Sequence, residues 1–279
     1  MTKDQLLGTR PLYLFVAVTF GLSTFTTSAQ NTYKEIEVKD GGTVTGVVRF
    51  VGASPDLPQF DVTKNPEQCG HKKQFDRLIL GKNNGVKNAV VSLEGITEGK
   101  KFAINVMYTI NQKNCEYIPH VAIVPIGAQL QIVNSDNILH NVHAYTYGKE
   151  VRTVCNIAQP IKGQCTILKQ SQLDKAGVIL TTCDAGHPWM TGNLILCEHP
   201  YYTLTDNNGK FTLTDVPSGT YRIKMWHEGF KITGTETENS KVKRYHFEDP
   251  YEVVKEVTLP DKGKAVVSFE FSSRLENVN

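Results

Sequence analysis

Helical periodicity is nearly absent from this chain, and this constrains its fold more than any other feature. Short runs of alternating apolar and polar residues recur along the sequence, bounded by Gly, Pro and Asn. One run covers residues 42–51. Within it, Val44, Val48 and Phe50 would share one face of a strand. Repeated runs of this kind, with turn residues between them, predict an all-β fold.

The same pattern predicts strands along most of the chain. Asn208-Gly209 is a turn dipeptide, so residues 203–213 are expected to form a hairpin. Further strands are predicted at residues 87–94, 101–110, 118–124, 127–133, 177–182, 191–196, 251–259 and 265–271.

The N-terminus is typical of a secretory signal peptide. Lys3 and Arg10 precede an apolar run at residues 11–20, and small residues follow as far as Ala29. We therefore expect residues 1–29 to be a signal peptide and the protein to be periplasmic or otherwise exported. The alternative is an uncleaved membrane anchor, and membrane association is expected only in that case.

Composition excludes several classes of protein. Of the 279 residues, 40% are hydrophobic and 21% are charged, which is typical of a globular protein rather than a disordered one. The formal net charge of +2 is too close to zero to indicate a nucleic-acid partner.

A short loop contains a set of metal-binding side chains. Cys183, His187 and Met190 fall within eight residues, between the predicted strands 177–182 and 191–196. A thiolate, two imidazoles and a weak axial thioether are the ligands of electron-transfer copper sites. The loop lacks one histidine, and His140 offers it from upstream.

These two segments resemble the cupredoxin family. Residues 134–142 resemble the plastocyanin segment that carries the first copper histidine. By that resemblance His140 is the first ligand, and Asn141 steadies the cysteine loop by hydrogen bonding. The Cys-x3-His-x2-Met spacing is similar to the second half of the dinuclear CuA loop of cytochrome oxidase subunit two. That centre needs a second cysteine where this chain has Ile179, so a mononuclear site is expected.

The resemblance implies a function as well as a site. It implies one type 1 copper per chain, with His140, Cys183, His187 and Met190 as ligands. The protein would carry one electron and would not be an enzyme. Its expected partner is another exported redox protein, such as a c-type cytochrome, met transiently at the exposed edge of His187 beside Pro188 and Trp189.

Other interpretations of the site remain open. Met190 could be a core residue, Cys183 a structural cysteine, and His143 the ligand in place of His140. A second metal site is conceivable from His120, His143, His199 and His227. The protein could also bind or deliver copper without redox cycling, or act as an extracytoplasmic binding module through its flanking strands.

Export permits disulfides, but the sequence does not establish their pairing. Cys155 and Cys165 flank a turn-rich stretch that could fold back and bring them together. Cys69 and Cys115 would then form a longer bridge, leaving Cys197 free or buried.

A second resemblance concerns the chain on both sides of the copper segment. The pattern Thr-Asp-x-x-Gly-x-Phe followed by Val-Pro-x-Gly-x-Tyr, at residues 205–221, resembles the carboxypeptidase-regulatory-like, or transthyretin-like, β-sandwich. We expect residues 42–99 and 199–272 to form one such sandwich, interrupted by a cupredoxin Greek-key sandwich at residues 100–198. The alternative is three small modules in series.

Overall fold

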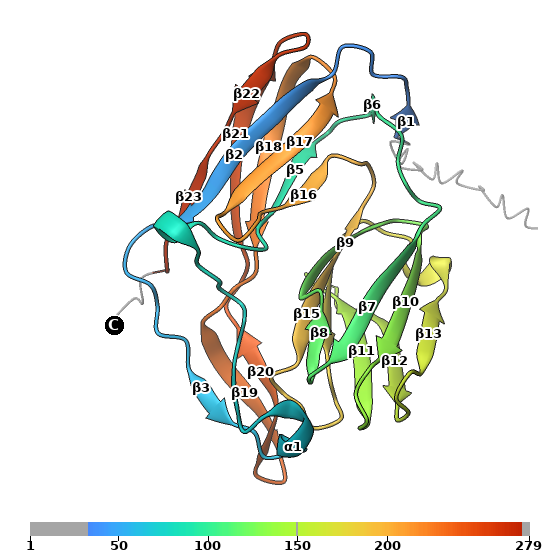
Figure 1. Cartoon of the computed structure of the whole chain (residues 1–279), viewed down its shortest axis with the longest axis vertical. Coiled ribbons are helices and arrows are strands. Elements are labelled where there is room, and N and C mark those ends of the chain that lie inside the picture. Colours follow the sequence, from blue (N-terminus) through green and yellow to red (C-terminus); the bar gives the residue numbers. More distant parts are fainter. Residues whose placement is uncertain (1–32, 149, 275–279) are drawn as a thin grey trace, which may run out of the picture. The chain divides into compact units, whose positions relative to one another are not determined.

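The computed structural model describes residues 33–148 and 150–274 of the chain. These residues form short β-strands joined by turns, with a four-residue α-helix and two 3-10 turns (Figure 1). The all-β prediction is therefore confirmed. Within the described residues, no helix is both long and apolar enough to cross a bilayer. The signal peptide predicted at residues 1–29 lies outside this part of the chain.

One pair of sheets, which we call sandwich A, is built from strands near both ends of the chain. Its first sheet has the order β16 (Tyr202–Leu204), β5 (Val90–Glu94), β18 (Gly219–His227) and β21 (Tyr251–Leu259). In its second sheet, β2 (Gly42–Phe50) pairs with β17 (Lys210–Val216), β22 (Lys264–Val266) and β23 (Phe269–Phe271). Burial alternates along β2 as predicted, and Val44, Val48 and Phe50 enter the core.

A second pair of sheets, sandwich B, uses the middle of the chain. Its smaller sheet has the order β13 (Cys165–Leu168), β10 (Gln129–Asn134), β7 (Met107–Lys113) and β8 (Glu116–Ile118). Its larger sheet has the order β12 (Thr153–Gln159), β11 (His140–Thr146), β14 (Gly177–Thr182), β15 (Thr191–Cys197) and β9 (Val121–Pro125). Strand β15 is buried along its whole length.

The remaining elements are small and lie outside these four sheets. They are β1 (Lys34–Glu35) with β6 (Glu98–Gly99), β3 (Gln59–Asp61) with β4 (Lys72–Gln74), β19 (Ile232–Glu238) with β20 (Lys241–Phe247), α1 (Pro66–Cys69), and 3-10 turns at Lys82–Asn84 and Gln170–Gln172. The segment that contains β3, α1 and β4 packs on sandwich B, since the ring of Phe60 lies 5.8 Å from that of Trp189. Val62 and Cys69 are buried in the core of sandwich B.

The order of the strands is compatible with an inserted sandwich, because β7 to β15 lie between β5 and β16 in the sequence. The described residues nevertheless form a single compact unit. The division into residues 42–99 with 199–272 and residues 100–198 stays a prediction, as does the transthyretin-like resemblance.

The predicted hairpin at residues 203–213 is wrong in one respect. The chain does turn there, with hydrogen bonds from the N–H of Gly209 to the carbonyl of Asp206 and from the N–H of Asp206 to the carbonyl of Lys210. Strands β16 and β17, however, pair in different sheets of sandwich A. The turn also needs glycine, because Gly209 has φ of 75° and a Cβ there would meet the Val48 carbonyl oxygen at 2.3 Å.

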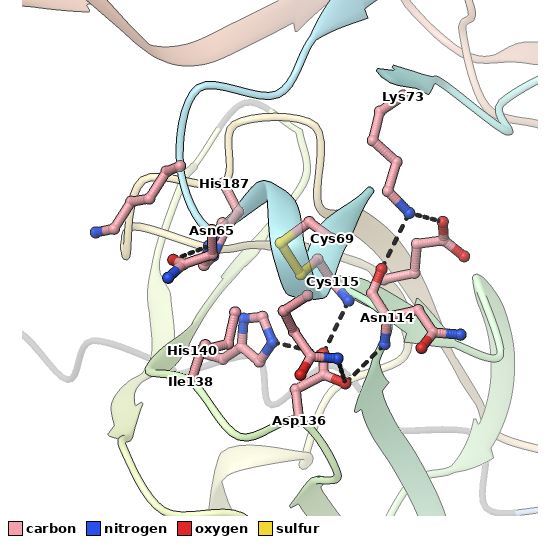
Figure 2. Close-up of a disulfide and its surroundings, with 12 residues drawn as sticks. Asn65, Cys69, Lys73, Asn114, Cys115, Asp136, Ile138, His140 and His187 are labelled. Atoms are coloured by element: carbon pink, nitrogen blue, oxygen red, sulfur yellow. Dashed lines mark hydrogen bonds and ion pairs between the residues drawn. A yellow bond between two sulfur atoms is a disulfide. The ribbon is translucent and has the colours of Figure 1, made fainter. Parts of the chain in front are cut away.

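One of the two predicted disulfides is present. Cys69 and Cys115 are bridged across 46 residues (Figure 2). The predicted pairing of Cys155 with Cys165 is wrong, since both are free. The turn between them does not form a hairpin: β12 and β13 belong to the two opposite sheets of sandwich B. Cys197 is free and buried, as expected.

A buried carboxylate joins elements that come from both sandwiches. Glu228, which follows β18, accepts hydrogen bonds from Arg77 Nη2 at 2.8 Å and Asn193 Nδ2 at 2.9 Å, and also pairs with His120 Nε2. Burial alone would raise the pKa of Glu228, but the charges of Arg77 and His120 outweigh it and hold that pKa at about 2. The carboxylate is therefore ionised in the folded protein at neutral pH.

The buried histidine beside this carboxylate gives a prediction for acid stability. His227 is 2% exposed and its Nδ1 lies 2.8 Å from the Glu228 carbonyl oxygen. Burial lowers the pKa of His227 to about 4. Below its unfolded pKa of about 6.5 the unfolded chain binds a proton that the folded chain does not, so stability falls as pH drops. We expect this histidine to account for a loss of roughly 2–3 kcal/mol between about pH 7 and 4.5.

The variant His227→Asn isolates this contribution. Asparagine can place an N–H donor near the position of Nδ1 but does not titrate. Urea unfolding of the metal-free protein at both pH values should show a smaller acid loss in the variant than in the parent. Equal losses would contradict the prediction.

Candidate metal centre

The register of three strands brings the predicted ligands to one end of sandwich B. Thr182 and Thr191 pair at the ends of β14 and β15, so the loop between them projects from the edge of the sheet. Strand β11 runs antiparallel to β14 with His143 opposite Thr182. His140 therefore lies beyond the end of β14. It is close to Cys183, the first residue after that strand.

The donor atoms of three predicted ligands converge. Cys183 Sγ lies 3.9 Å from His140 Nδ1 and 3.5 Å from His187 Nδ1. All three side chains are buried, and their ligand atoms lie within 4.8 Å of one another. Donors about 2.0 Å (N) and 2.3 Å (S) from one metal ion in a trigonal plane are separated by about 3.7 Å. The observed separations fit a single ion, and one thiol with two imidazoles is the donor set that suits copper.

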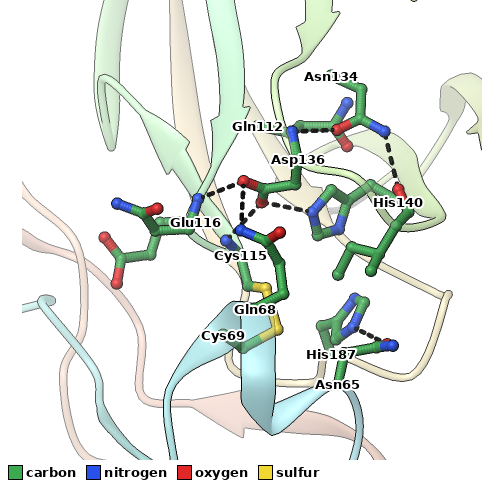
Figure 3. Close-up of polar contacts among 12 residues, drawn as sticks. Asn65, Gln68, Cys69, Gln112, Cys115, Glu116, Asn134, Asp136, His140 and His187 are labelled. Carbon is green, nitrogen blue, oxygen red and sulfur yellow. Dashed lines mark hydrogen bonds and ion pairs between the residues drawn. A yellow bond between two sulfur atoms is a disulfide. The ribbon is translucent and has the colours of Figure 1, made fainter. Parts of the chain in front are cut away.

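A carboxylate fixes the orientation of His140. Asp136 Oδ2 lies 2.9 Å from His140 Nε2 and also accepts the backbone N–H of Cys115 at 2.8 Å (Figure 3). An ionised carboxylate can only accept, so the proton of the His140 ring resides on Nε2. The lone pair of Nδ1 then points to the space beside Cys183.

An amide plays the same part for His187. Asn65 Oδ1 accepts from His187 Nε2 at 3.2 Å, which leaves Nδ1 free to face Cys183 (Figure 3). Asn65 precedes α1, far from the loop in sequence. No local motif could have identified it, whereas Asp136 stands four residues before His140 on the same loop and could have been proposed.

The cysteine loop is held by Asn141, as predicted from the resemblance. The Asn141 side-chain oxygen accepts the backbone N–H of Asp184 at 3.3 Å, and its own backbone N–H lies 3.4 Å from Cys183 Sγ. A hydrogen bond to the sulfur reduces its electron density, which is one way in which a protein tunes a thiolate ligand.

Burial gives all three predicted ligands their neutral forms. It raises the pKa of Cys183 to about 11 and, with the neighbouring His140 and Lys64, lowers the pKa of His187 to about 4. Burial also lowers the pKa of His140, against the opposing effect of Asp136. At neutral pH both imidazoles are ready to bind a metal, whereas the thiol must first lose a proton.

This gives a prediction for metal affinity. Copper binding should release one proton, from Cys183, so the apparent copper affinity should rise about tenfold per pH unit between about pH 7 and 9, where both histidines are already neutral. Competition against a chelator of known pH dependence would measure the slope. A slope near zero would mean that the thiol stays protonated and is not a ligand.

The fourth predicted ligand, Met190, is buried at the end of the loop. It is 1% exposed, shares a core cluster with Cys183, and donates its backbone N–H to the His187 carbonyl at 2.9 Å. This turn holds Met190 near His187, at the end of the loop that carries the predicted ligands. Its role as axial ligand stays a prediction.

The expectation that His187 forms an exposed edge is wrong. His187 is 0% exposed. Trp189, expected in an exposed collar, is 7% exposed and donates from Nε1 to the Cys115 carbonyl at 3.2 Å. The cause is the chain around α1, which lies outside the segment that resembles a cupredoxin and covers this end of sandwich B.

The other histidines do not assemble into a second site. His143 points to the opposite face of β11 from His140, where its Nδ1 lies 2.8 Å from Asp184. His120 pairs with Glu228, and His199 Nδ1 accepts a backbone N–H from Tyr201 at 3.2 Å. In the described part of the chain, no cluster of three potential ligands contains His120, His143, His199 or His227.

Comparisons with known proteins give partial similarities only. No protein-family model matches the sequence, and no curated protein matches it. A copper-containing nitrite reductase from Thermus scotoductus is 19% identical with a TM-score of 0.28, covering 34% of this chain and 23% of that one. A purple cupredoxin from Nitrosopumilus maritimus is 19% identical with a TM-score of 0.28, covering 32% and 99%. An oxidised amicyanin variant is 19% identical with a TM-score of 0.27, covering 32% and 81%.

The chain thus spans under a quarter of the nitrite reductase, and each of these matches involves about a third of this chain.

Proposed function

We propose that this chain is an exported, mononuclear type 1 copper protein that carries one electron at a time between redox partners. The observation that carries the proposal is the buried convergence of Cys183 Sγ with the Nδ1 atoms of His140 and His187. Copper bound to such a set can alternate between two oxidation states.

The surrounding residues suit this task. His140, Cys183 and His187 would hold the metal, with Met190 as the proposed axial ligand. Asp136 and Asn65 orient the two imidazoles, and the N–H of Asn141 points at the sulfur. Because these groups are already held by strands and hydrogen bonds, little rearrangement is needed when the charge of the site changes.

Burial favours electron transfer over the alternatives. A catalyst needs an open position at the metal for its substrate, and a delivery protein must release its metal. A ligand set with His140 and His187 both at 0% exposure opposes both. Electrons, unlike substrates, can pass through a thin protein layer.

The partner we propose is another exported redox protein, such as a c-type cytochrome. Encounters of this kind bury small interfaces and are short-lived. Export itself is inferred from residues 1–29 and is part of the same proposal.

The test is a copper(II) titration of the purified protein, followed by visible absorption and electron paramagnetic resonance. We expect one copper per chain, an intense charge-transfer band, and narrow hyperfine splitting. A seven-line mixed-valence signal would show two coppers and overturn the mononuclear assignment. Absence of a visible band would overturn the thiolate site.

A further inference from the structure

We propose that residues 62–70 are a lid belonging to the metal centre, in which Asn65 positions His187 and the Cys69–Cys115 disulfide keeps the lid closed. The proposal rests on the function proposed above, because it takes His140, Cys183 and His187 as the ligands. It assigns roles to residues outside the segment that carries those ligands.

The side chain of Asn65 is used for the histidine instead of for its own helix. Asn65 is the N-cap residue of α1, a place where asparagine normally bonds to a backbone N–H of the first turn. Here no such capping bond is made, and φ is 52° with ψ of 46°. The oxygen accepts instead from His187 Nε2 at 3.2 Å. A usual local interaction is given up for one with a metal ligand, as happens at functional sites.

Two more contacts tie the lid to both ligand loops. Lys64 Nζ donates to the Ala185 carbonyl at 2.5 Å, within the Cys183–His187 loop. Gln68 Nε2 donates to Asp136 Oδ1 at 3.2 Å, on the carboxylate that orients His140. The lid therefore contacts the outer side of each histidine, one directly and one through Asp136.

The disulfide anchors the lid beside the same carboxylate. Cys69 ends α1, and its partner Cys115 donates its backbone N–H to Asp136 at 2.8 Å (Figure 2). A helix of four residues has no stability of its own. The covalent link, together with burial of Val62 at 7% and Cys69 at 4%, holds this short segment in place.

Closing the lid explains why His187 is 0% exposed. The surface that a redox partner meets at this end of sandwich B includes Lys64 and Glu67, which are exposed, and not the imidazole edge. Asn65 is thus a positioning residue for His187, and the disulfide controls how often the site opens to solvent.

The first test replaces Asn65. Glycine suits φ of 52° and removes only the side chain, whereas Asn65→Asp keeps an acceptor oxygen. In the metal-free protein, ¹⁵N NMR should show His187 largely as the Nε2–H tautomer. We expect Asn65→Gly to give a mixture of tautomers and Asn65→Asp to restore the single form. An unchanged His187 signal in Asn65→Gly would overturn the positioning role.

The second test removes the tether. In the double variant Cys69→Ser with Cys115→Ser, alkylation of each remaining cysteine in the metal-free protein is followed by peptide mass spectrometry. Cys183 should react at least tenfold faster than in the parent. Exposed Cys165 should react equally in both proteins, and buried Cys155 should stay protected, which reports an intact core.

The outcomes separate the alternatives. Protection of Cys183 equal to that in the parent overturns the lid. If Cys155 also becomes reactive in the double variant, the core has opened. The lid is then tested by comparing the alkylation rate of Cys183 in Asn65→Gly with the rate in the parent. None of these measurements needs copper, so the two failures can be told apart. If only the copper titration failed, residues 62–70 would still cover Cys183 and orient His187 but would not be the lid of a copper site. If only the lid tests failed, the copper assignment would be untouched.

Discussion

Replacing Cys183 with serine is expected to abolish the charge-transfer colour and the type 1 resonance signal of the copper-loaded protein. Both depend on a copper–thiolate bond, and a serine hydroxyl remains protonated and is a harder, poorer ligand for copper. The fold should survive, because the change is isosteric and the serine oxygen can still accept the N–H of Asn141, which lies 3.4 Å from the sulfur. Visible absorption, electron paramagnetic resonance and thermal unfolding would measure the three quantities.

The matched control is Cys155→Ser. Cys155 is also free, 6% exposed, and part of the core of sandwich B, but it belongs to no potential ligand cluster in the described part of the chain. It should keep full colour. Colour retained in Cys183→Ser would refute the ligand assignment, and colour lost in both would point to a general loss of packing.

The variant Arg77→Met is expected to destabilise the protein by about 3–5 kcal/mol, because it leaves the buried charge of Glu228 with one fewer partner. The Arg77 and Glu228 side chains are 5% and 4% exposed, and Arg77 also donates to the Gly229 carbonyl at 2.7 Å and to Thr191 Oγ1 at 3.2 Å. The three bonds join sandwich A to β15 of sandwich B. Urea unfolding at pH 7 would measure the loss.

The matched control is Arg222→Met. Its ion pair with Glu94 has a similar separation, 3.1 Å, but the Arg222 side chain is 68% exposed. An exposed pair is screened by water and contributes under about 1 kcal/mol. If Arg77→Met costs no more than this control, the buried network does not join the two sandwiches as we infer.

Acid should weaken the same network. The folded pKa of Glu228 is about 2, below its unfolded value of 4.5. The stabilisation from Glu228 is therefore complete above its unfolded pKa and is lost as pH falls toward its folded pKa.

The double variant Arg77→Met with Glu228→Gln should recover part of the stability that Arg77→Met loses at neutral pH, because no buried charge is left unpaired.

The sequence by itself determined the features that depend on local spacing. Alternation of apolar residues fixed the all-β architecture, and β2 buries the face that Val44, Val48 and Phe50 define. The loop from Cys183 to His187 could be found because its donors are close in the chain and bounded by strands. His140 and Asn141 were identified only through the resemblance of residues 134–142 to a plastocyanin segment, and the structure places His140 at the start of β11.

Only the tertiary structure decided what encloses the site and how the cysteines pair. His187 and Asn65 are 122 residues apart, Lys64 and Ala185 are 121 apart, and nothing near either partner marks it for the other. Cys155 and Cys165 are close in sequence yet unpaired, since their strands lie in opposite sheets. Contacts of this kind depend on how whole sheets and the chain around α1 pack against one another. Local residue patterns do not predict that packing.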